Sequence, residues 1–214
     1  MTDERKGGLA LIAGSFGLIA TMSFHPSGHD LFRPGALDES SALAYASHAL
    51  AIAGMAVTLL GAIALSRRAA SSDRSAVAAL VAYGLSVVAG TAAAVASGFV
   101  GPGLVREILE TTDAAARETW HAVLAYNFRV NQAFSRVLVV ASSTAIVLWS
   151  AAIVRSRALH RAVALYGLLI GPAAVVAVLS GRLRLDVHGL GLVVLAQSAW
   201  FISTGVLLCR VRTT

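Results

Sequence analysis

Six long runs of apolar residues alternate with short polar segments along the chain. A helix that crosses a lipid bilayer needs about 20 mostly apolar residues. The pattern therefore predicts an all-α polytopic membrane protein, with one transmembrane domain over residues 1–214 formed by a bundle of six helices. The runs that meet the length requirement are 8–24, 43–65, 76–99, 133–154, 162–180 and 189–209.

Composition supports this prediction and narrows the range of partners. The chain has 57% hydrophobic and 13% charged residues, whereas soluble domains carry roughly 25% charged residues. The net charge of +6 does not indicate a nucleic-acid partner, because the basic residues are scattered over short loops and form no nucleic-acid motif. Membrane lipid is the partner that we expect, and a partner membrane subunit is a further option.

Arginines gather at the ends of two predicted spans, at Arg67 and Arg68 and at Arg155 and Arg157. Short loops rich in basic residues stay on the cytoplasmic side of a membrane. We therefore predict that both chain termini are cytoplasmic and that the protein is integral to the cell (inner) membrane. The outer, periplasmic side then holds the connections 25–42, 100–132 and 181–188.

The longest outer connection is expected to contain a helix of its own. Gly101-Pro102-Gly103 should break the third span, and residues 104–120 are predicted to form an extra outer-face helix between spans 3 and 4. A helix running unbroken from Glu118 to Val154 would be about 55 Å long at a rise of 1.5 Å per residue. Such a helix must either project beyond the bilayer or bend near Asn127.

Polar side chains gather where the fourth span begins. Arg129, Gln132 and Arg136 are spaced to share one helix face, and a charged side chain at the edge of lipid usually marks function or a fixed partner. Arginine holds carboxylate and phosphate groups in a two-pronged geometry, so we predict a binding surface for an anionic or lipid-like ligand. The predicted substrate-binding residues are Asn127, Arg129, Asn131, Gln132, Arg136, Arg182 and Arg184.

Histidines recur at a single depth in the predicted bundle. Counting about 20 residues from the inner end of each span places His25, His48 and His188 at the outer boundary, with His29 slightly above them. Imidazole suits zinc, copper and iron, so we predict a divalent metal ion of this kind, held by some of these four histidines, with Asp30 or Asp186 as a further candidate ligand. The alternative is that the histidines are scattered around the bundle at interface depth.

Two carboxylates and a further histidine lie at a similar level and are candidates for acid–base chemistry. The predicted catalytic residues are Asp30, Asp186 and His121. A haem held between His48 and another helix is a rival use of the histidines, although no span carries two histidines about four turns apart.

These residues favour a metal-dependent membrane enzyme that acts on a lipid-like or anionic substrate. The first alternative is a non-catalytic membrane subunit or binding protein, for lipid, pigment, haem or a partner protein. The second is a small transporter. The transporter has the least support, because the inner halves of the predicted spans are nearly all apolar.

Overall fold

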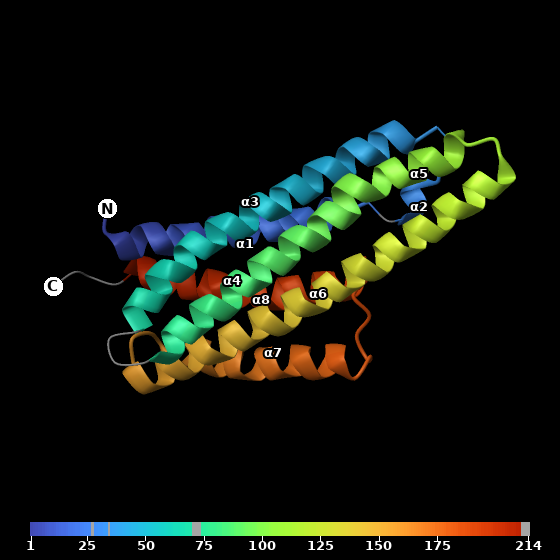
Figure 1. The fold of residues 1–214 in the computed structure, drawn as a ribbon. Coiled ribbons are helices and arrows are strands. Elements are labelled where there is room, and N and C mark those ends of the chain that lie inside the picture. Colours follow the sequence, from blue (N-terminus) through green and yellow to red (C-terminus); the bar gives the residue numbers. More distant parts are fainter. Residues whose placement is uncertain (27, 34, 70–73, 211–214) are drawn as a thin grey trace.

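Six helices that are long and apolar enough to cross a membrane make up the computed structural model (Figure 1). The structure describes residues 1–214 apart from 27, 34, 70–73 and 211–214, and the described residues contain no strand. The expected set of six apolar helices is therefore confirmed. Most of them are longer than the apolar runs that predicted them, because the helices continue into polar sequence at their ends.

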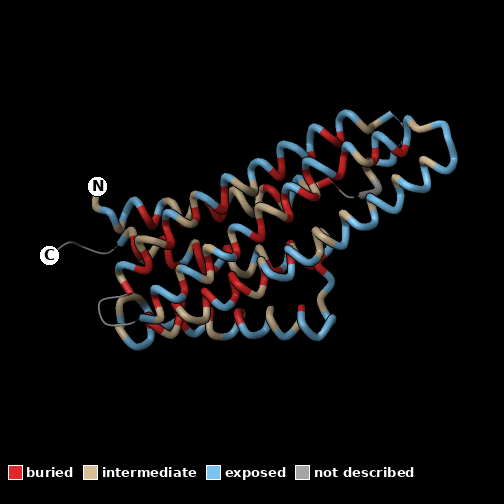
Figure 2. Tube along the Cα trace, in the orientation of Figure 1, coloured by how far each residue is buried: buried red, intermediate tan, exposed pale blue. Residues whose placement is uncertain are grey.

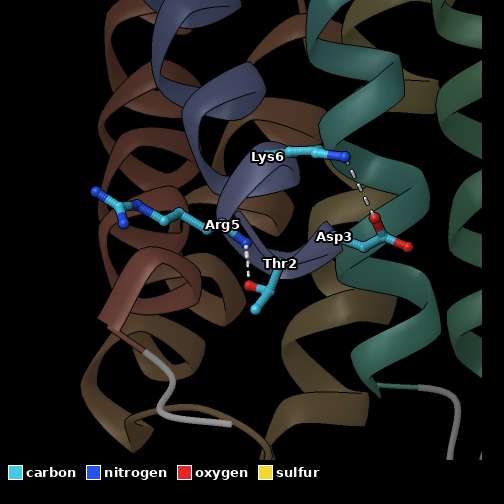
Figure 3. Close-up of polar contacts among 4 residues, drawn as sticks. All are labelled: Thr2, Asp3, Arg5 and Lys6. Atoms are coloured by element: carbon cyan, nitrogen blue, oxygen red, sulfur yellow. Dashed lines mark hydrogen bonds and ion pairs between the residues drawn. The ribbon is translucent and has the colours of Figure 1, made fainter.

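The elements keep the labels of Figure 1. In chain order they are α1 (Asp3–Phe24), α2 (Gly28–Leu31), α3 (Leu37–Ala69), α4 (Arg74–Ala94), the π-helical turn η1 (Val95–Val100), α5 (Gly101–Glu110), α6 (Ala114–Ser156), α7 (Arg161–Leu179) and α8 (Val187–Arg210). The start of α1 is capped, because Thr2 Oγ1 accepts the N–H of Arg5 at 3.3 Å (Figure 3). Lys6 Nζ lies 3.9 Å from Asp3 Oδ1 in the same turn.

The two ends of the bundle hold different parts of the chain. α1 begins and α8 ends at one end, where Cys209 Sγ lies 3.6 Å from Arg5 O. The α6–α7 turn lies there too, and we call this the terminal end (Figure 1). The short helix α2, the α5–α6 turn and the α7–α8 connection lie at the opposite end, which we call the α2 end.

The third long segment differs from the sequence-based expectation. Gly101-Pro102-Gly103 does not break it, because η1 leads directly into α5 and Pro102 lies in the first turn of α5, next to the wider hydrogen-bond pattern of the π-helical turn. The break falls at residues 111–113, where Asp113 caps α6 by accepting the N–H of Ala116 at 2.8 Å. Residues 104–120 are therefore shared between α5 and α6 and do not form one separate outer helix.

α6 is the longest element. Its 43 residues correspond to about 64 Å at 1.5 Å per residue, roughly twice the hydrocarbon thickness of a bilayer. It runs unbroken past Asn127, and its first turns extend with α5 beyond α7 (Figure 1). Arg106 of α5 and Asp38 of α3 form an ion pair at 2.5 Å in this extension.

Small residues allow the helices to approach closely. A Cβ added at Gly61 of α3 would lie 2.7 Å from Gly7 O of α1. One added at Gly171 of α7 would lie 2.9 Å from Ser143 O of α6. Any side chain at these two positions would therefore have to displace backbone atoms of the neighbouring helix.

Large aromatic side chains fill the bundle toward the terminal end. Trp149 and Trp200 are fully buried and stack with ring centroids 6.1 Å apart. Each indole N–H has a partner, because Trp149 donates to Ser66 Oγ at 2.9 Å and Trp200 donates to Val163 O at 3.0 Å. This half of the bundle is thus packed with its polar aromatic groups satisfied.

The outer surfaces of the helices are largely exposed, while buried residues run along the inside of the bundle (Figure 2). On α4 the exposed positions are apolar and recur at helical spacing. The residues that are more than half exposed here are Val77, Val81, Leu85 and Val88. A continuous exposed apolar face of this kind suits contact with lipid.

Candidate functional site

A cavity of about 600 Å³ lies between the helices toward the α2 end. Its walls come from α1, α3, α4, α6 and α8, with contributions from η1 and α5. Most of the lining is apolar, for example Leu18, Met55, Leu138 and Val194. The volume falls within the range of roughly 300–1,000 Å³ that small-molecule sites occupy.

Polar side chains form a smaller part of the same wall. They are Thr21, His25, His48, Ser97, His121, Asn127, Asn131, Gln132, Ser135 and Asp186. Among the described residues that line the cavity, none is arginine or lysine. The cavity therefore offers apolar contact and hydrogen bonding without a permanently charged cation.

Two of the predicted metal ligands meet at the wall of this cavity. His25 directly follows α1, and His48 is buried on α3. Their Nε2 atoms are 3.1 Å apart, and their ring centroids are 4.6 Å apart in an edge-on arrangement. The fold thus brings these two imidazoles into direct contact.

The other nitrogen of each ring contacts a backbone carbonyl. His25 Nδ1 lies 2.8 Å from Pro26 O, and His48 Nδ1 lies 2.7 Å from Ala44 O. A carbonyl oxygen only accepts hydrogen bonds, so these contacts assign the ring proton of each histidine to Nδ1. Burial lowers the pKa of His25 below its ordinary value, which favours the neutral ring. In these neutral tautomers the two Nε2 lone pairs face each other.

The π-helical turn η1 packs directly against this pair. A Cβ added at Gly98 would lie 2.5 Å from His48 Nδ1, so glycine is the residue that leaves room for the ring. A π-turn replaces the regular i→i+4 hydrogen bonds of the helix with wider ones, and such turns are frequent at functional sites. Here the turn brings the backbone of the third span against an imidazole.

Three predicted substrate-binding amides hold backbone around the cavity. Asn127 and Asn131 each donate to a carbonyl oxygen, one in η1 and one in α4, at 2.9 Å. Gln132 donates to Leu185 O in the α7–α8 connection, also at 2.9 Å. These three residues line the cavity, and their amide nitrogens connect its walls.

The predicted substrate-binding arginines lie elsewhere. Arg129 and Arg136 are exposed on α6, and Arg182 and Arg184 are exposed in the α7–α8 connection. None of the four lines the cavity or forms an ion pair with a carboxylate in the described part of the chain. Asn127, Asn131 and Ser135 line the cavity from one face of α6, and both arginines of α6 lie outside this face.

The remaining predicted metal ligands are not seen to join the pair. His188 is exposed in the first turn of α8 and does not line the cavity. The side chain of His29 lies outside the described part of the structure. The described residues contain no group of three or more His, Cys, Asp or Glu side chains that could hold a metal ion. Of the four candidate histidine ligands, the structure brings together His25 and His48.

The predicted catalytic residues are spread over the α2 end. Asp186 lines the cavity and caps α8 by accepting the N–H of Gly189 at 2.8 Å. His121 is exposed on α6 and also lines the cavity. Asp30 is half-buried on α2 and is not among the lining residues. Two of the three therefore share a cavity with the histidine pair.

Sequence reasoning did not single out Gly98 or the apolar wall of the cavity. Gly98 is one small residue in a span with many, and its contact with His48 depends on a π-turn that no spacing in the sequence indicates. The available signal was Asn127 and Asn131, which are four residues apart and so share a helix face. In the structure both amides donate hydrogen bonds to backbone carbonyls of the neighbouring third span.

The fold and the cavity define the class of protein. It is an all-helical chain whose six long helices are apolar enough for a membrane and surround a mostly apolar cavity. Comparison of the chain with protein-family models, with curated proteins and with solved structures finds no match. The function is therefore argued from the geometry of the cavity.

Proposed function

We propose that the chain is an integral membrane protein that binds a lipid-like ligand in this cavity. The observation that carries the proposal is about 600 Å³ of mostly apolar space within a bundle of helices apolar enough for a membrane. Sites for small molecules are concave and mostly apolar, with a few polar groups that fix orientation. A ligand with an apolar body and one polar end suits this combination.

The polar end of the ligand is expected beside His25 and His48. A phosphate or another multiply charged headgroup is disfavoured, because the described lining has no arginine to hold it. We therefore expect a small polar end, such as one carboxyl or hydroxyl group. Of the hypotheses raised by the sequence, the non-catalytic lipid-binding protein has the most support.

We further propose the cell membrane as the setting, with the α2 end on the outer side, because the basic helix ends predict this orientation. Membrane lipid is then both the surrounding medium and the source of the ligand. A partner subunit, and catalytic roles for Asp30, Asp186 and His121, stay predictions, since no observation favours a reaction over binding.

Photo-crosslinking with a diazirine-labelled long-chain fatty acid tests the proposal. Purified protein in proteoliposomes is irradiated and digested, and the labelled peptides are identified by mass spectrometry. We expect labelling of wall segments that include Met55 and Leu138. Ala51 lines the cavity from α3, so Ala51→Phe fills the space and should reduce this labelling about tenfold, equivalent to about 1.4 kcal/mol of binding free energy.

Ala53→Phe is the matched control. Ala53 lies two residues further along α3, is exposed and does not line the cavity. This variant should keep the labelling of the wall segments. Equal labelling of the two variants, or labelling restricted to lipid-facing positions such as Val81 and Val88, would contradict the proposal.

A further inference from the structure

The contact between His25 and His48 is the part of the cavity that apolar binding does not explain. With a proton on each Nδ1, two neutral imidazoles place their Nε2 lone pairs opposite each other at 3.1 Å. Lone pairs at this distance repel each other. With these tautomers the Nε2–Nε2 contact has no proton of its own, and a metal ion or a shared proton would supply the missing bond.

The separation of the two nitrogens fits a shared metal ion. Zinc–imidazole bonds are about 2.0–2.1 Å long, and two of them at a tetrahedral angle place the nitrogens about 3.3 Å apart. The distance between His25 Nε2 and His48 Nε2, 3.1 Å, is close to that value. A metal ion would thus need little movement of either ring.

The backbone contacts of the pair are those expected of metal-binding histidines. Such residues almost always donate their other ring N–H to a carboxylate, a backbone carbonyl or water, which fixes the tautomer and the orientation of the ring. His25 and His48 both do so to backbone carbonyls. Gly98 packs against the Nδ1 side of the His48 ring, which holds its Nε2 atom toward His25.

The surroundings oppose a shared proton. A third proton would turn one ring into an imidazolium within a mostly apolar wall, where a charge is costly unless it is paired. Asp186 is the carboxylate that lines the cavity, and one of its oxygens accepts the N–H of Gly189. The other titratable group of the lining, His121, supplies no negative charge. A divalent metal ion carries more charge, but it takes further ligands, and water or a carboxyl end of a ligand in the cavity would join the two nitrogens in offsetting its desolvation.

We propose that His25 and His48 bind one divalent transition-metal ion, zinc or copper, through their Nε2 atoms. Imidazole is a preferred ligand of both metals. Two nitrogens leave coordination positions that water, or the polar end of a ligand in the cavity, would fill. The metal site can be tested independently of the proposed lipid binding, because the experiment measures bound metal.

Titration with zinc by calorimetry tests the site. Full-length protein in detergent, freed of its affinity tag and treated with a chelator, is titrated with Zn²⁺ without added lipid. We expect one equivalent of bound zinc. His25→Gln and His48→Gln each remove a ligand and should weaken zinc binding by at least about 100-fold. Gly98→Ala crowds the His48 ring and should cost about 10- to 100-fold, the usual effect of disturbing an outer partner.

His160→Gln and His188→Gln are the matched controls. His160 caps the start of α7 by accepting the N–H of Ala162, and neither histidine lines the cavity. Both variants should keep the zinc affinity of the unmodified protein, and elution on size-exclusion chromatography reports whether each variant is folded. If the pair variants do not fold, the electron paramagnetic resonance spectrum of Cu²⁺ bound to the unmodified protein decides. It should show hyperfine coupling from two imidazole nitrogens.

Several outcomes would overturn the site. One is the same zinc affinity in the four histidine variants. Another is an unmodified protein that binds no equivalent of zinc, or a copper spectrum with fewer than two nitrogen ligands. A shared proton would then remain as the occupant of the pair. The crosslinking and zinc experiments are read separately, so the failure of one leaves the other standing.

Discussion

Asn131 shows at the residue scale how polar groups serve the framework of the cavity. Its amide nitrogen donates to Ala93 O of α4 at 2.9 Å. Asn127, one helical turn earlier, makes the equivalent contact with η1. Both side chains are half-buried and cross from α6 to the third span. Interhelical hydrogen bonds of this kind contribute modestly in membranes, about 0.6 kcal/mol on average.

The residue-scale prediction concerns this contact. Asn131→Leu keeps the size of the side chain, removes the donor and leaves Ala93 O without it in an apolar setting. We expect a loss of about 1 kcal/mol in the free energy of unfolding, measured in detergent by tryptophan fluorescence. Arg129→Leu, at an exposed position of the same helix, should change stability by less than about 0.5 kcal/mol. Equal losses in the two variants would show that the amide bond is not the cause.

The position of His25 and His48 along their helices could be predicted from sequence, and the direction in which each histidine points around its helix could not. Counting from the inner ends predicted one level for His25, His48 and His188. The structure brings the first two together, whereas His188 is exposed on α8. The rotation of a helix is set by the packing of its whole length against its neighbours, and a single residue's depth carries no information about it.

At the scale of elements, contacts between glycines determine how closely α1 and α3 pack. A Cβ at Gly61 would lie 2.6 Å from Leu11 Cγ and 2.7 Å from Gly7 O. By contrast, a Cβ at Gly84 of α4 would meet nothing within 4 Å. A substitution at Gly84 changes only the helix propensity, whereas the same substitution at Gly61 also disturbs close packing, so comparing the two separates these effects.

The element-scale prediction compares valine at these two positions. Gly61→Val should force α1 away from α3 and lower the free energy of unfolding by about 1–3 kcal/mol, the usual cost of overpacking. Gly84→Val should be close to neutral. Thermal unfolding in detergent measures both. A Gly84→Val protein that is destabilised as much as Gly61→Val would argue against close helix contact at Gly61.

The ends of the elements were the least predictable part of the fold. Apolar runs located all six helices, because burial in lipid requires length and low polarity. They did not locate the continuation of the third span through Gly101 and Pro102 into α5. This segment contains polar residues, so an apolar run does not mark it. A proline in the first turn is compatible with a helix, so the break depends on Asp113 capping α6.

At the scale of the whole molecule, the arrangement of the helices constrains the topology. α1 begins and α8 ends at the terminal end, where Arg68 of α3 pairs with Glu4 of α1 at 3.5 Å. Arginines are also present in the α6–α7 turn at this end. Short loops on the cytoplasmic side of a membrane carry an excess of Arg and Lys, so this distribution favours a cytoplasmic position for the terminal end.

The whole-molecule prediction is tested with single cysteines in a Cys209→Ser background. Glu110→Cys lies at the end of α5, and Arg161→Cys lies at the start of α7; both positions are exposed. A membrane-impermeant maleimide added to intact cells should label Glu110→Cys. It should reach Arg161→Cys only after the membrane is permeabilised. Labelling of both from the same side would refute the six-span topology.

The π-helical turn η1 shifts the helical register of the third span by one residue. An α-helix continued without it from Arg74 would use one residue fewer, and Val105 would then stand where Arg106 now meets Asp38. One residue corresponds to a rotation of about 100°. The turn thus gives α4 and α5, which form one continuous helical segment with it, different helical registers. The part that precedes the turn keeps its apolar stripe outward, and the projecting part directs Val105 inward and Arg106 to its partner.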